Sequence, residues 1–428
     1  MTAELTLKPG FHRAAYQAMP NPQQAYLLLE AIPGPASPGT GSQAVNFSMV
    51  LDRSGSMVGE KMRQMKDAAK HILDRLGPED ILSIVIFDDD ADLIVPAGPV
   101  KDRDALTGRI DSILERGGTH MSIGMQMGLQ EIQKWQSPER VSSMLLLTDG
   151  QTWEDQEQCK RLADKFLASG IPIYVLGLGV GDESNWDPQL LEELAGRSGG
   201  EWTLIDSPEK VSTVFENTLL TMKGSAVTNA NLTMRLVEGV EPRTVWRVTP
   251  LISRLGHHAV SVHDVQVYLG DIQHGVGQTI LADLLLPERH AGTFRLIQAD
   301  ITYDVPATGL SGQKVSTDIV TNFTDDASLI NQTDQRIMNI VERVVAHRLQ
   351  TQALDEAAMG DSRRATQRLR AAATRLLELG EDELAQQASF QAQQLEQGGQ
   401  LDHESAQRMR YATKKLTQFD MDNQEPTV

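Results

Sequence analysis

Short apolar segments that alternate with helical segments between residues 45 and 222 constrain the fold more than any other feature of the chain. The apolar segments have the length of strands and lie at residues 45–51, 81–87, 143–148, 171–180 and 201–205. Segments with helical spacing or composition follow at residues 59–76, 103–114, 122–135, 155–169, 188–198 and 208–222. Continuous apolar strands separated by helices are typical of a parallel sheet that is covered on both faces. We therefore expect an α/β doubly wound domain over residues 43–222.

The pattern changes on both sides of this domain. After Gly224 the segments are of the strand type, without intervening helices, at residues 227–237, 244–249, 260–269, 278–286, 294–305 and 315–323. The early apolar run at residues 23–32 has no partner inside the α/β domain. We therefore expect residues 1–42 and 223–325 to form one antiparallel β-sandwich into which the α/β domain is inserted.

Residues 326–420 are rich in Ala, Gln, Arg and Leu and predict an α-helical region. Glycines at positions 360, 380 and 398 divide this region into about four helices that would form a bundle. Residues 421–428 are expected to be a disordered tail. The predicted fold class is thus multidomain, with an inserted parallel-sheet domain, a β-sandwich and a helical bundle.

The charge and the cysteine content exclude several classes of partner and site. The 39 Lys and Arg residues against 58 Asp and Glu residues give a net charge of −19, which argues against a nucleic-acid partner. The only cysteine, Cys159, excludes an internal disulfide framework and a cysteine-based zinc site. We see no secretory leader and no apolar run that would span a membrane, so we expect a cytoplasmic protein without a membrane segment.

Oxygen-bearing side chains follow the strands where their carboxyl ends would meet. They are Asp52, Ser54 and Ser56 after the first strand, Thr119 before a helix, and Asp149 after the third strand. Hydroxyl and carboxylate oxygens favour Mg²⁺, with Ca²⁺ or Mn²⁺ also possible, over zinc or copper. The set brings at most two negative charges, so the metal would stay electrophilic and could accept an anionic oxygen from outside.

These residues resemble the metal-ion-dependent adhesion site (MIDAS) of the von Willebrand factor A (VWA) family. The family pattern is Asp-x-Ser-x-Ser, then Thr, then Asp, and the resemblance covers residues 43–222. It implies that Ser54, Ser56 and Thr119 contact the metal directly, and that Asp52 and Asp149 act partly through water. It also implies a protein partner whose Asp or Glu carboxylate completes the coordination.

Other residues near these loops are weaker candidates. Met57, His120 and Trp153 flank the expected metal loops, together with Val58 next to Met57, and could form a rim that contacts the partner. His120 departs from the family pattern, in which Asn is usual after the Thr. The run of acidic residues 88–90, together with Asp92, could hold a second cation, although a solvated loop is favoured.

The chain as a whole more loosely resembles VWA proteins in which a β domain and a helical region follow. The strings at residues 267–272 and 284–287 carry this second resemblance. Since the last predicted VWA helix, residues 208–222, leads directly into the sandwich, binding at the metal site could be coupled to the other domains. A rigid junction is the slightly favoured alternative.

The predicted function is that of a non-enzymatic adaptor that binds a partner carboxylate through Mg²⁺. One alternative is an accessory, chaperone-like subunit of an AAA+ ATPase complex, because VWA proteins often serve such complexes. A metal-dependent phosphotransferase or hydrolase is the third choice. Enzymes that resemble the haloacid dehalogenase family pair an aspartyl nucleophile with a second Asp two residues further on. Ser54 occupies that place here and cannot supply the carboxyl proton.

Overall fold

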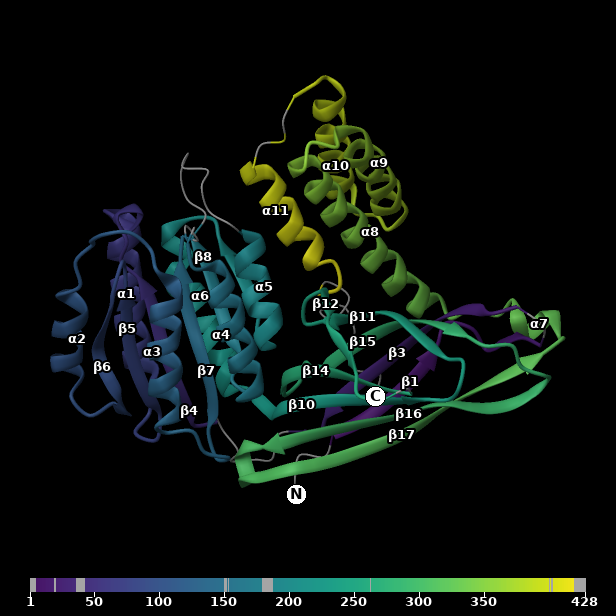
Figure 1. Cartoon of the computed structure of the whole chain (residues 1–428), viewed down its shortest axis with the longest axis horizontal. Helices are drawn as coiled ribbons and strands as arrows, with labels where there is room; N and C mark the ends of the chain where they lie inside the picture. The colour runs from purple at the N-terminus through teal and green to yellow at the C-terminus, as the bar shows by residue number, and fades with distance from the viewer. Residues whose placement is uncertain are drawn as a thin grey trace.

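The computed structural model describes residues 5–18, 21–35, 43–149, 152, 154–178, 188–261, 263–399, 401 and 403–418. The tail expected at residues 421–428 lies outside the described residues. Figure 1 shows three parts: a layered α/β domain on the left, long strands at the lower right, and a helical region above them. None of the described helices is both long and apolar enough to span a membrane.

The α/β domain contains one six-stranded sheet. Its spatial order is β6 (Ala91–Pro99), β5 (Ile81–Phe87), β4 (Val45–Asp52), β7 (Val141–Thr148), β8 (Ile173–Leu178) and β9 (Trp202–Ile205). All neighbours pair in parallel except β5 and β6, which are antiparallel. The chain builds outward from β4 to β5 and β6, and then returns to β7 on the other side. The edge between β4 and β7 is therefore the topological switch point, where ligands bind in open α/β sheets.

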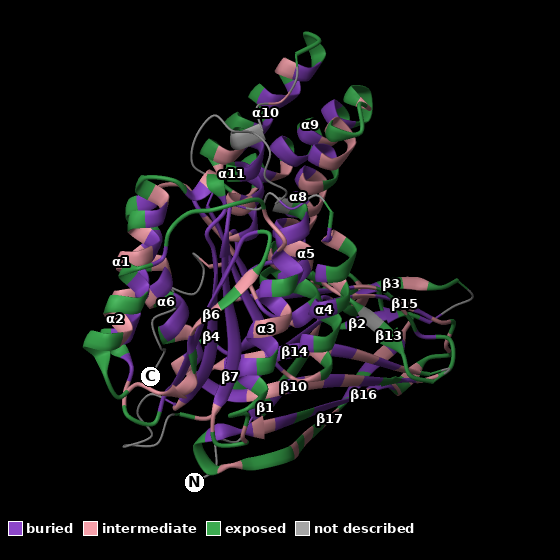
Figure 2. Ribbon diagram, turned by 60° about the vertical axis from the view of Figure 1, so that its left-hand side comes forward, coloured by how far each residue is buried: buried purple, intermediate pink, exposed green. Residues whose placement is uncertain are grey.

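Helices cover both faces of this sheet. One face packs against α1 (Glu60–Arg75), α2 (Arg103–Asp111) and α6 (Val211–Lys223), and the other against α3 (Met121–Gln133), α4 (Gln156–Ala168) and α5 (Pro188–Ser198). Every residue of β4, β5, β7 and β8 is buried, as the purple central strands in Figure 2 show. Burial on both faces explains why these strands are continuous apolar runs rather than alternating ones.

Two antiparallel sheets form the sandwich. The first contains β1 (Leu5–Phe11), β3 (Gln23–Pro33), β15 (Gln278–Leu286), β11 (Glu241–Thr249) and β12 (Ser253–Leu255) in that order. The second contains β13 (His257–Ala259), β14 (Asp264–Gln273), β10 (Ser225–Leu236), β16 (Gly292–Val305), β17 (Leu310–Thr324) and β2 (Ala15–Gln17), of which the short β2 pairs in parallel. One apolar core lies between the sheets.

Strands from both sides of the α/β domain pair in this sandwich, which confirms the expected fold class. Nine residues of β3 pair with β15 across the inserted segment. The two ends of that segment meet, because the Gln43 amide donates a hydrogen bond to the Lys223 carbonyl oxygen at 3.0 Å. The Lys223 ammonium also lies 2.5 Å from the buried Asp80 carboxylate, which accepts from the Val45 amide. Such close ends allow a domain to be inserted without disturbing its host.

The helical region contains α7 (Ala327–Ile330), α8 (Gln335–Ala358), α9 (Ser362–Glu378), α10 (Asp382–Glu396) and α11 (His403–Lys414). Gly360, Gly380 and Gly398 adopt positive φ angles where helices end, as the sequence predicted. The Asp361 carboxylate caps α9 by accepting from the Arg364 amide at 3.1 Å. Apolar residues of α8, α9, α10 and α11 pack against Trp246 and other residues of the first sandwich sheet.

Candidate metal centre

The three loops predicted to carry the metal ligands meet at the switch point of the sheet. Asp52 is the last residue of β4, and Asp149 directly follows β7, the strand next to it. The Gly55 amide of the first loop donates to the Gly117 carbonyl oxygen of the second at 3.2 Å. The Thr152 hydroxyl, beyond β7, donates to the Thr119 carbonyl oxygen at 3.1 Å. Hydrogen bonds thus connect all three loops.

Asp52 is fully buried and held by two hydrogen bonds. The Ser54 amide donates to Asp52 Oδ1 at 2.8 Å, and the Thr148 hydroxyl donates to Asp52 Oδ2 at 2.6 Å. Its position in the sheet, beside the last residues of β7, makes the second bond possible. These two donors fix the orientation of the carboxylate and leave lone pairs on both of its oxygens for a water or a cation.

The hydroxyl groups of the first loop point toward each other. Ser54 Oγ lies 3.0 Å from Ser56 Oγ, with Ser54 buried and Ser56 partly exposed. The short helix formed by residues 55–57 turns the chain so that alternate residues carry these two hydroxyls on one side. The site thus combines buried oxygens with an outer edge that solvent reaches.

Two adjacent glycines determine the backbone path of the second loop. Gly117 has φ +69°, and a Cβ at either Gly117 or Gly118 would fall within 2.6 Å of an Asp89 carboxylate oxygen. The Gly118 amide instead donates to Asp89 Oδ2 at 3.0 Å. Since a side chain at either position would push the loop away, the glycines allow Thr119 to sit next to the first loop.

Two carboxylates share this site, and their charges disfavour each other. Burial, followed by the charge of Asp149, raises the pKa of Asp52 well above its ordinary value. Asp149 is also buried, and its Oδ1 atom has no hydrogen-bond partner among the residues that the structure describes. Its Oδ2 atom lies 3.3 Å from the ammonium of Lys61, which α1 brings to the site.

The donor set fits a hard divalent cation. A buried carboxylate oxygen without a partner, a second carboxylate beside it and neutral hydroxyls are the groups that such an ion prefers. Among the described residues no group of three or more His, Cys, Asp and Glu side chains lies close enough together to hold a metal. The residues that could hold the ion are Asp52, Ser54, Ser56, Thr119 and Asp149.

The structure changes the expected rim. Met57 is fully buried in the apolar core under α1, so the expectation that it contacts a partner is wrong. The next residue, Val58, is instead 61% exposed. Leu114, in the loop that leads to Thr119, is 69% exposed. Trp153, the third predicted rim residue, lies outside the described residues.

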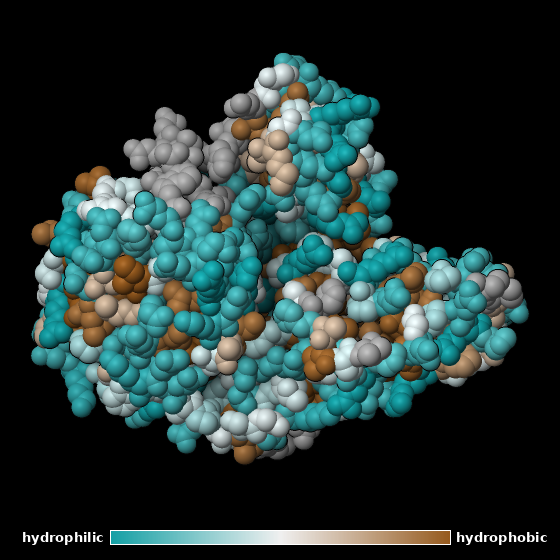
Figure 3. Space-filling view, in the orientation of Figure 1, coloured by the Kyte–Doolittle hydropathy of each residue, from teal (hydrophilic) through white to brown (hydrophobic). Residues whose placement is uncertain are grey.

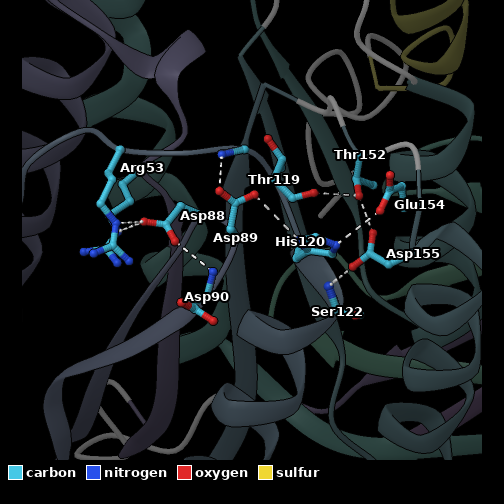
Figure 4. Close-up of polar contacts among 12 residues, drawn as sticks. Arg53, Asp88, Asp89, Asp90, Thr119, His120, Ser122, Thr152, Glu154 and Asp155 are labelled. Carbon is cyan, nitrogen blue, oxygen red and sulfur yellow. Dashed lines mark hydrogen bonds and ion pairs between the residues drawn. The ribbon is translucent and has the colours of Figure 1, made fainter.

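His120 is partly exposed at the start of α3, as expected for a rim position. Figure 4 shows its ring between two acidic side chains. Its Nδ1 atom lies 3.9 Å from Asp89 Oδ1, and its Nε2 atom lies 3.7 Å from Glu154 Oε2. The ring thus lies at the outer edge of the site with a carboxylate on either side.

The acidic run after β5 has a structural role in the described chain. The buried Asp88 carboxylate accepts from Arg53 Nε at 2.7 Å and from Arg116 Nε at 3.0 Å. Arg53 lies between the metal residues Asp52 and Ser54, so this ion pair, shown in Figure 4, braces the first loop. Asp92 pairs with the same arginine at 2.6 Å. These pairs give no support to a second cation site.

Several contributors were not predicted from the sequence. Thr148 orients Asp52, and Lys61 neutralises Asp149. Asp155 accepts a hydrogen bond from the Ser122 amide at 2.6 Å and another from the Thr152 hydroxyl, as Figure 4 shows. A lysine on a helix or a threonine at a strand end is too common for sequence spacing to reveal such roles.

A doubly wound sheet with these loops at its switch point defines the class of the domain. Residues 47–217 match the von Willebrand factor type A domain, and the chain therefore contains a VWA domain. Such domains typically mediate protein–protein interactions and commonly use a divalent metal at the MIDAS. Residues 335–419 match a second family, described as the Sll0103-like, C-terminal alpha-helical domain.

Two relatives are similar to this chain over different lengths of sequence. The uncharacterised protein sll0103 of Synechocystis sp. is 31% identical over 269 residues, which are 62% of this chain and 63% of that protein. Inter-alpha-trypsin inhibitor heavy chain H3 of Pongo abelii is 28% identical over 167 residues, which are 36% of this chain and 18% of that protein. The matches thus span less than two thirds of either relative.

A solved structure shares the architecture of the whole chain. It is described as von Willebrand factor type A from Catenulispora acidiphila, with a TM-score of 0.79 and 17% sequence identity. The match covers 97% of both chains. At this identity the likeness concerns the fold, including the β sheets and helical region that accompany the VWA domain.

Proposed function

We propose that the chain is a metal-dependent protein-interaction module, an adaptor whose VWA domain binds a carboxylate of a partner protein through Mg²⁺. One observation carries the proposal: three loops bring two buried carboxylates together with hydroxyl groups at the switch point, and one carboxylate oxygen there lacks a partner. When bound, the ion would supply an electrophilic centre able to accept an anionic oxygen from outside the molecule.

Some residues of the site would bind the ion, and others orient the residues that bind it. Ser54, Ser56 and Thr119 would offer neutral oxygens, so the ion keeps most of its charge for an incoming carboxylate. Thr148 and the Ser54 amide hold Asp52 in one orientation. The Lys61 ammonium lies 3.3 Å from Asp149 Oδ2 and balances charge at the site while no ion is bound.

Exposed apolar side chains beside the metal loops favour a protein partner over a small ion or substrate. Val58 and Leu114 are both more than half exposed and lie in the first and second loops. A carboxylate that approaches the ion would bring neighbouring partner residues against them, and their burial would add to the binding free energy. His120 adds a titratable group at the same edge.

We propose that the chain is not an enzyme. An Asp52 nucleophile of the kind used by aspartyl-phosphate enzymes would lack the carboxylic acid that those enzymes place two residues further on, because Ser54 stands there. The role of an accessory subunit for an AAA+ ATPase remains a second proposal of the same binding class. A cytoplasmic location likewise remains a prediction from the sequence.

Calorimetric titration with Mg²⁺ tests the metal centre. We expect one ion per chain for the intact protein and at least a tenfold weaker affinity for a Ser54→Ala, Ser56→Ala variant. The matched control is Asp90→Asn, an exposed acidic residue of the neighbouring run. Equal affinities for the intact protein and the double variant would refute the proposed ligand set.

Partner retrieval tests the adaptor role separately. Proteins captured from a cell extract by the intact chain in Mg²⁺ are compared with those captured in EDTA and by the double variant. A partner that depends on both the ion and the two serines, and loses binding when its own acidic residue is changed, supports the proposal. Metal-dependent release of phosphate from phosphate esters would favour the enzymatic alternative instead.

A further inference from the structure

A cavity lies where the three parts of the molecule meet, away from the metal loops. Its volume is about 850 Å³, and it is lined by α4, α5, the sandwich strands β11, β12 and β14, and the helices α8 and α11. Figure 1 shows α5, α11 and β12 converging at this place, and Figure 3 shows the surface receding there. The volume falls within the range of about 300–1,000 Å³ that small-molecule sites occupy, and domain junctions are preferred places for them.

The charges that line the cavity are not balanced. Six cationic side chains face four carboxylates, in a chain whose net charge is −19. Every lining carboxylate has a cation: Asp164 and Glu193 contact Arg197, Glu192 contacts Lys414, and Asp355 contacts Arg410. The arginines in surplus are Arg247, Arg254 and Arg348, for which no ion pair is found within the described part of the chain.

Arg247 is the most informative of these arginines. It is only 6% exposed, and its hydrogen bonds go to neutral oxygens, the Ser253 hydroxyl at 3.1 Å and the Gly200 carbonyl at 3.5 Å. A buried guanidinium without an anion is costly, because the interior does not replace the water that it loses. Its remaining N–H groups are suited to a carboxylate or phosphate.

Further donors in the lining lack partners. Arg410 Nε, Thr351 Oγ1 and Tyr268 Oη are buried atoms for which the described residues supply no hydrogen-bond partner. Arg410 is itself only 4% exposed, its Nη2 atom pairs with Asp355 at 2.5 Å, and its Nη1 atom lies 4.0 Å from Glu192. Since buried donors are normally satisfied, the walls of the cavity carry donor groups that the described residues leave without an acceptor.

We propose that this cavity binds a small organic polyanion, a molecule that carries phosphate or carboxylate groups, held mainly by Arg247, Arg254 and Arg348. Trp246 and Tyr268 also line the cavity and offer apolar surface to the rest of the molecule. Since the lining comes from all three parts, the bound anion stabilises their packing against one another. The site is separate from the metal centre and does not depend on it.

Binding of two simple probes to chelator-treated full-length protein tests this site. Inorganic pyrophosphate represents phosphate ligands, citrate represents carboxylate ligands, and calorimetry and thermal unfolding report binding of each. We expect at least one probe to bind and to raise the midpoint of unfolding, and the probe that binds more tightly identifies the anion class. Arg247→Gln and Arg348→Gln should each weaken that binding about tenfold or more.

Three controls make the outcome decisive. Arg243→Gln alters an exposed arginine on the same strand as Arg247 but outside the cavity lining, and should bind as the intact protein does. Ser54→Ala, Ser56→Ala should also retain binding, which separates this site from the metal centre. If Arg247→Gln fails to fold, the half-buried Arg348 decides the matter. Failure of both probes at millimolar concentration, or undiminished binding by Arg348→Gln, overturns the proposal.

Discussion

Single side chains at the metal centre act by fixing the orientation and charge of its two carboxylates. Asp52 accepts one hydrogen bond from its own loop and one from the neighbouring strand, whereas Asp149 forms an ion pair with a lysine of α1. Neither Thr148 nor Lys61 belongs to the sequence motif. Both nevertheless change what the motif residues can do, because supporting contacts determine the geometry and affinity of metal ligands.

Thr148→Val removes the donor to Asp52 Oδ2 with little change of shape. We expect Mg²⁺ affinity to fall about tenfold, and the free energy of unfolding to fall by about 1–3 kcal/mol, because a buried acceptor loses its partner. Calorimetry and urea unfolding measure the two effects. The exposed strand residue Thr293, changed to Val in the same way, is the control. Unchanged Mg²⁺ affinity in Thr148→Val would contradict this role.

Lys61→Met tests the internal cation. Without metal, the variant should lose about 1–3 kcal/mol of stability, because the two buried carboxylates keep no neutralising charge. With metal, Mg²⁺ should bind several-fold more tightly, since the ammonium no longer repels it. Unfolding in EDTA and titration with Mg²⁺ give the two values, with the exposed Lys101→Met as control. Weaker Mg²⁺ binding would show instead that Lys61 supports the metal site.

Secondary structure was predictable where burial is complete. The strands β4, β5 and β7 appear in the sequence as apolar runs because both faces of each are covered. The strand β6 was not predicted, since it lies at the sheet edge, is only partly buried and contains proline. The edge strands β2, β12 and β13 were not predicted either, because three residues are too few to form a recognisable pattern, and β2 also pairs with the distant strand β17.

The candidate site was predictable to the level of its motif and no further. The five proposed ligands follow from residue types and spacing, and the structure brings their loops together. The rim was harder, because Met57 and Val58 are adjacent apolar residues, of which one is buried and the other exposed. Which of the two faces solvent depends on the turn of the 55–57 helix, a property of the folded loop.

Packing between elements sets the junction of the VWA domain with the sandwich. Gly199 has φ +77°, and a Cβ there would lie 2.1 Å from the ring of Tyr268 on β14. Gly199→Ala should therefore cost about 2–4 kcal/mol of stability, from strain and displacement of that ring. Gly196→Ala, in α5 with open space around it, is the control and should be neutral or slightly stabilising. Thermal unfolding compares them, and equal midpoints would contradict the close contact.

The contact between α8, α5 and α11 predicts a pH effect. Burial, together with Lys414 and Arg410, lowers the pKa of His347 to about 4, although Glu192 opposes this shift. The unfolded chain, with a histidine pKa of about 6.5, then binds a proton that the folded chain does not. The contribution of His347 to stability is therefore complete above pH 6.5 and is lost as the pH falls toward 4.

Urea unfolding at several pH values between 6.5 and 4 checks this effect. The free energy of unfolding of His347→Gln should fall less steeply as the pH is lowered, because the variant binds up to one proton fewer on unfolding. The difference in this fall is on the order of 3 kcal/mol at the acid end. The exposed His290→Gln serves as the control. A slope that is the same in His347→Gln and in the intact protein would mean that His347 is not buried in its neutral form.

On the scale of the whole molecule, the two candidate sites differ in how many parts of the chain form them. The metal centre lies at the switch point of one sheet and needs only the VWA domain. The polyanion cavity needs all three parts, because its lining comes from the VWA domain, the sandwich and the helical region. Because the two candidate sites share no residues, occupancy of each can be measured independently of the other.

The most direct measurement is an anomalous difference map from crystals of the full-length protein grown with Mn²⁺. The proposed function predicts one peak enclosed by the side chains of the first, second and third loops, with a coordination position that faces solvent or a carboxylate from a neighbouring molecule. With Mn²⁺ at saturating concentration, the absence of a peak between Asp52, Ser56 and Asp149, or a peak at the acidic run near Asp90 instead, would contradict it.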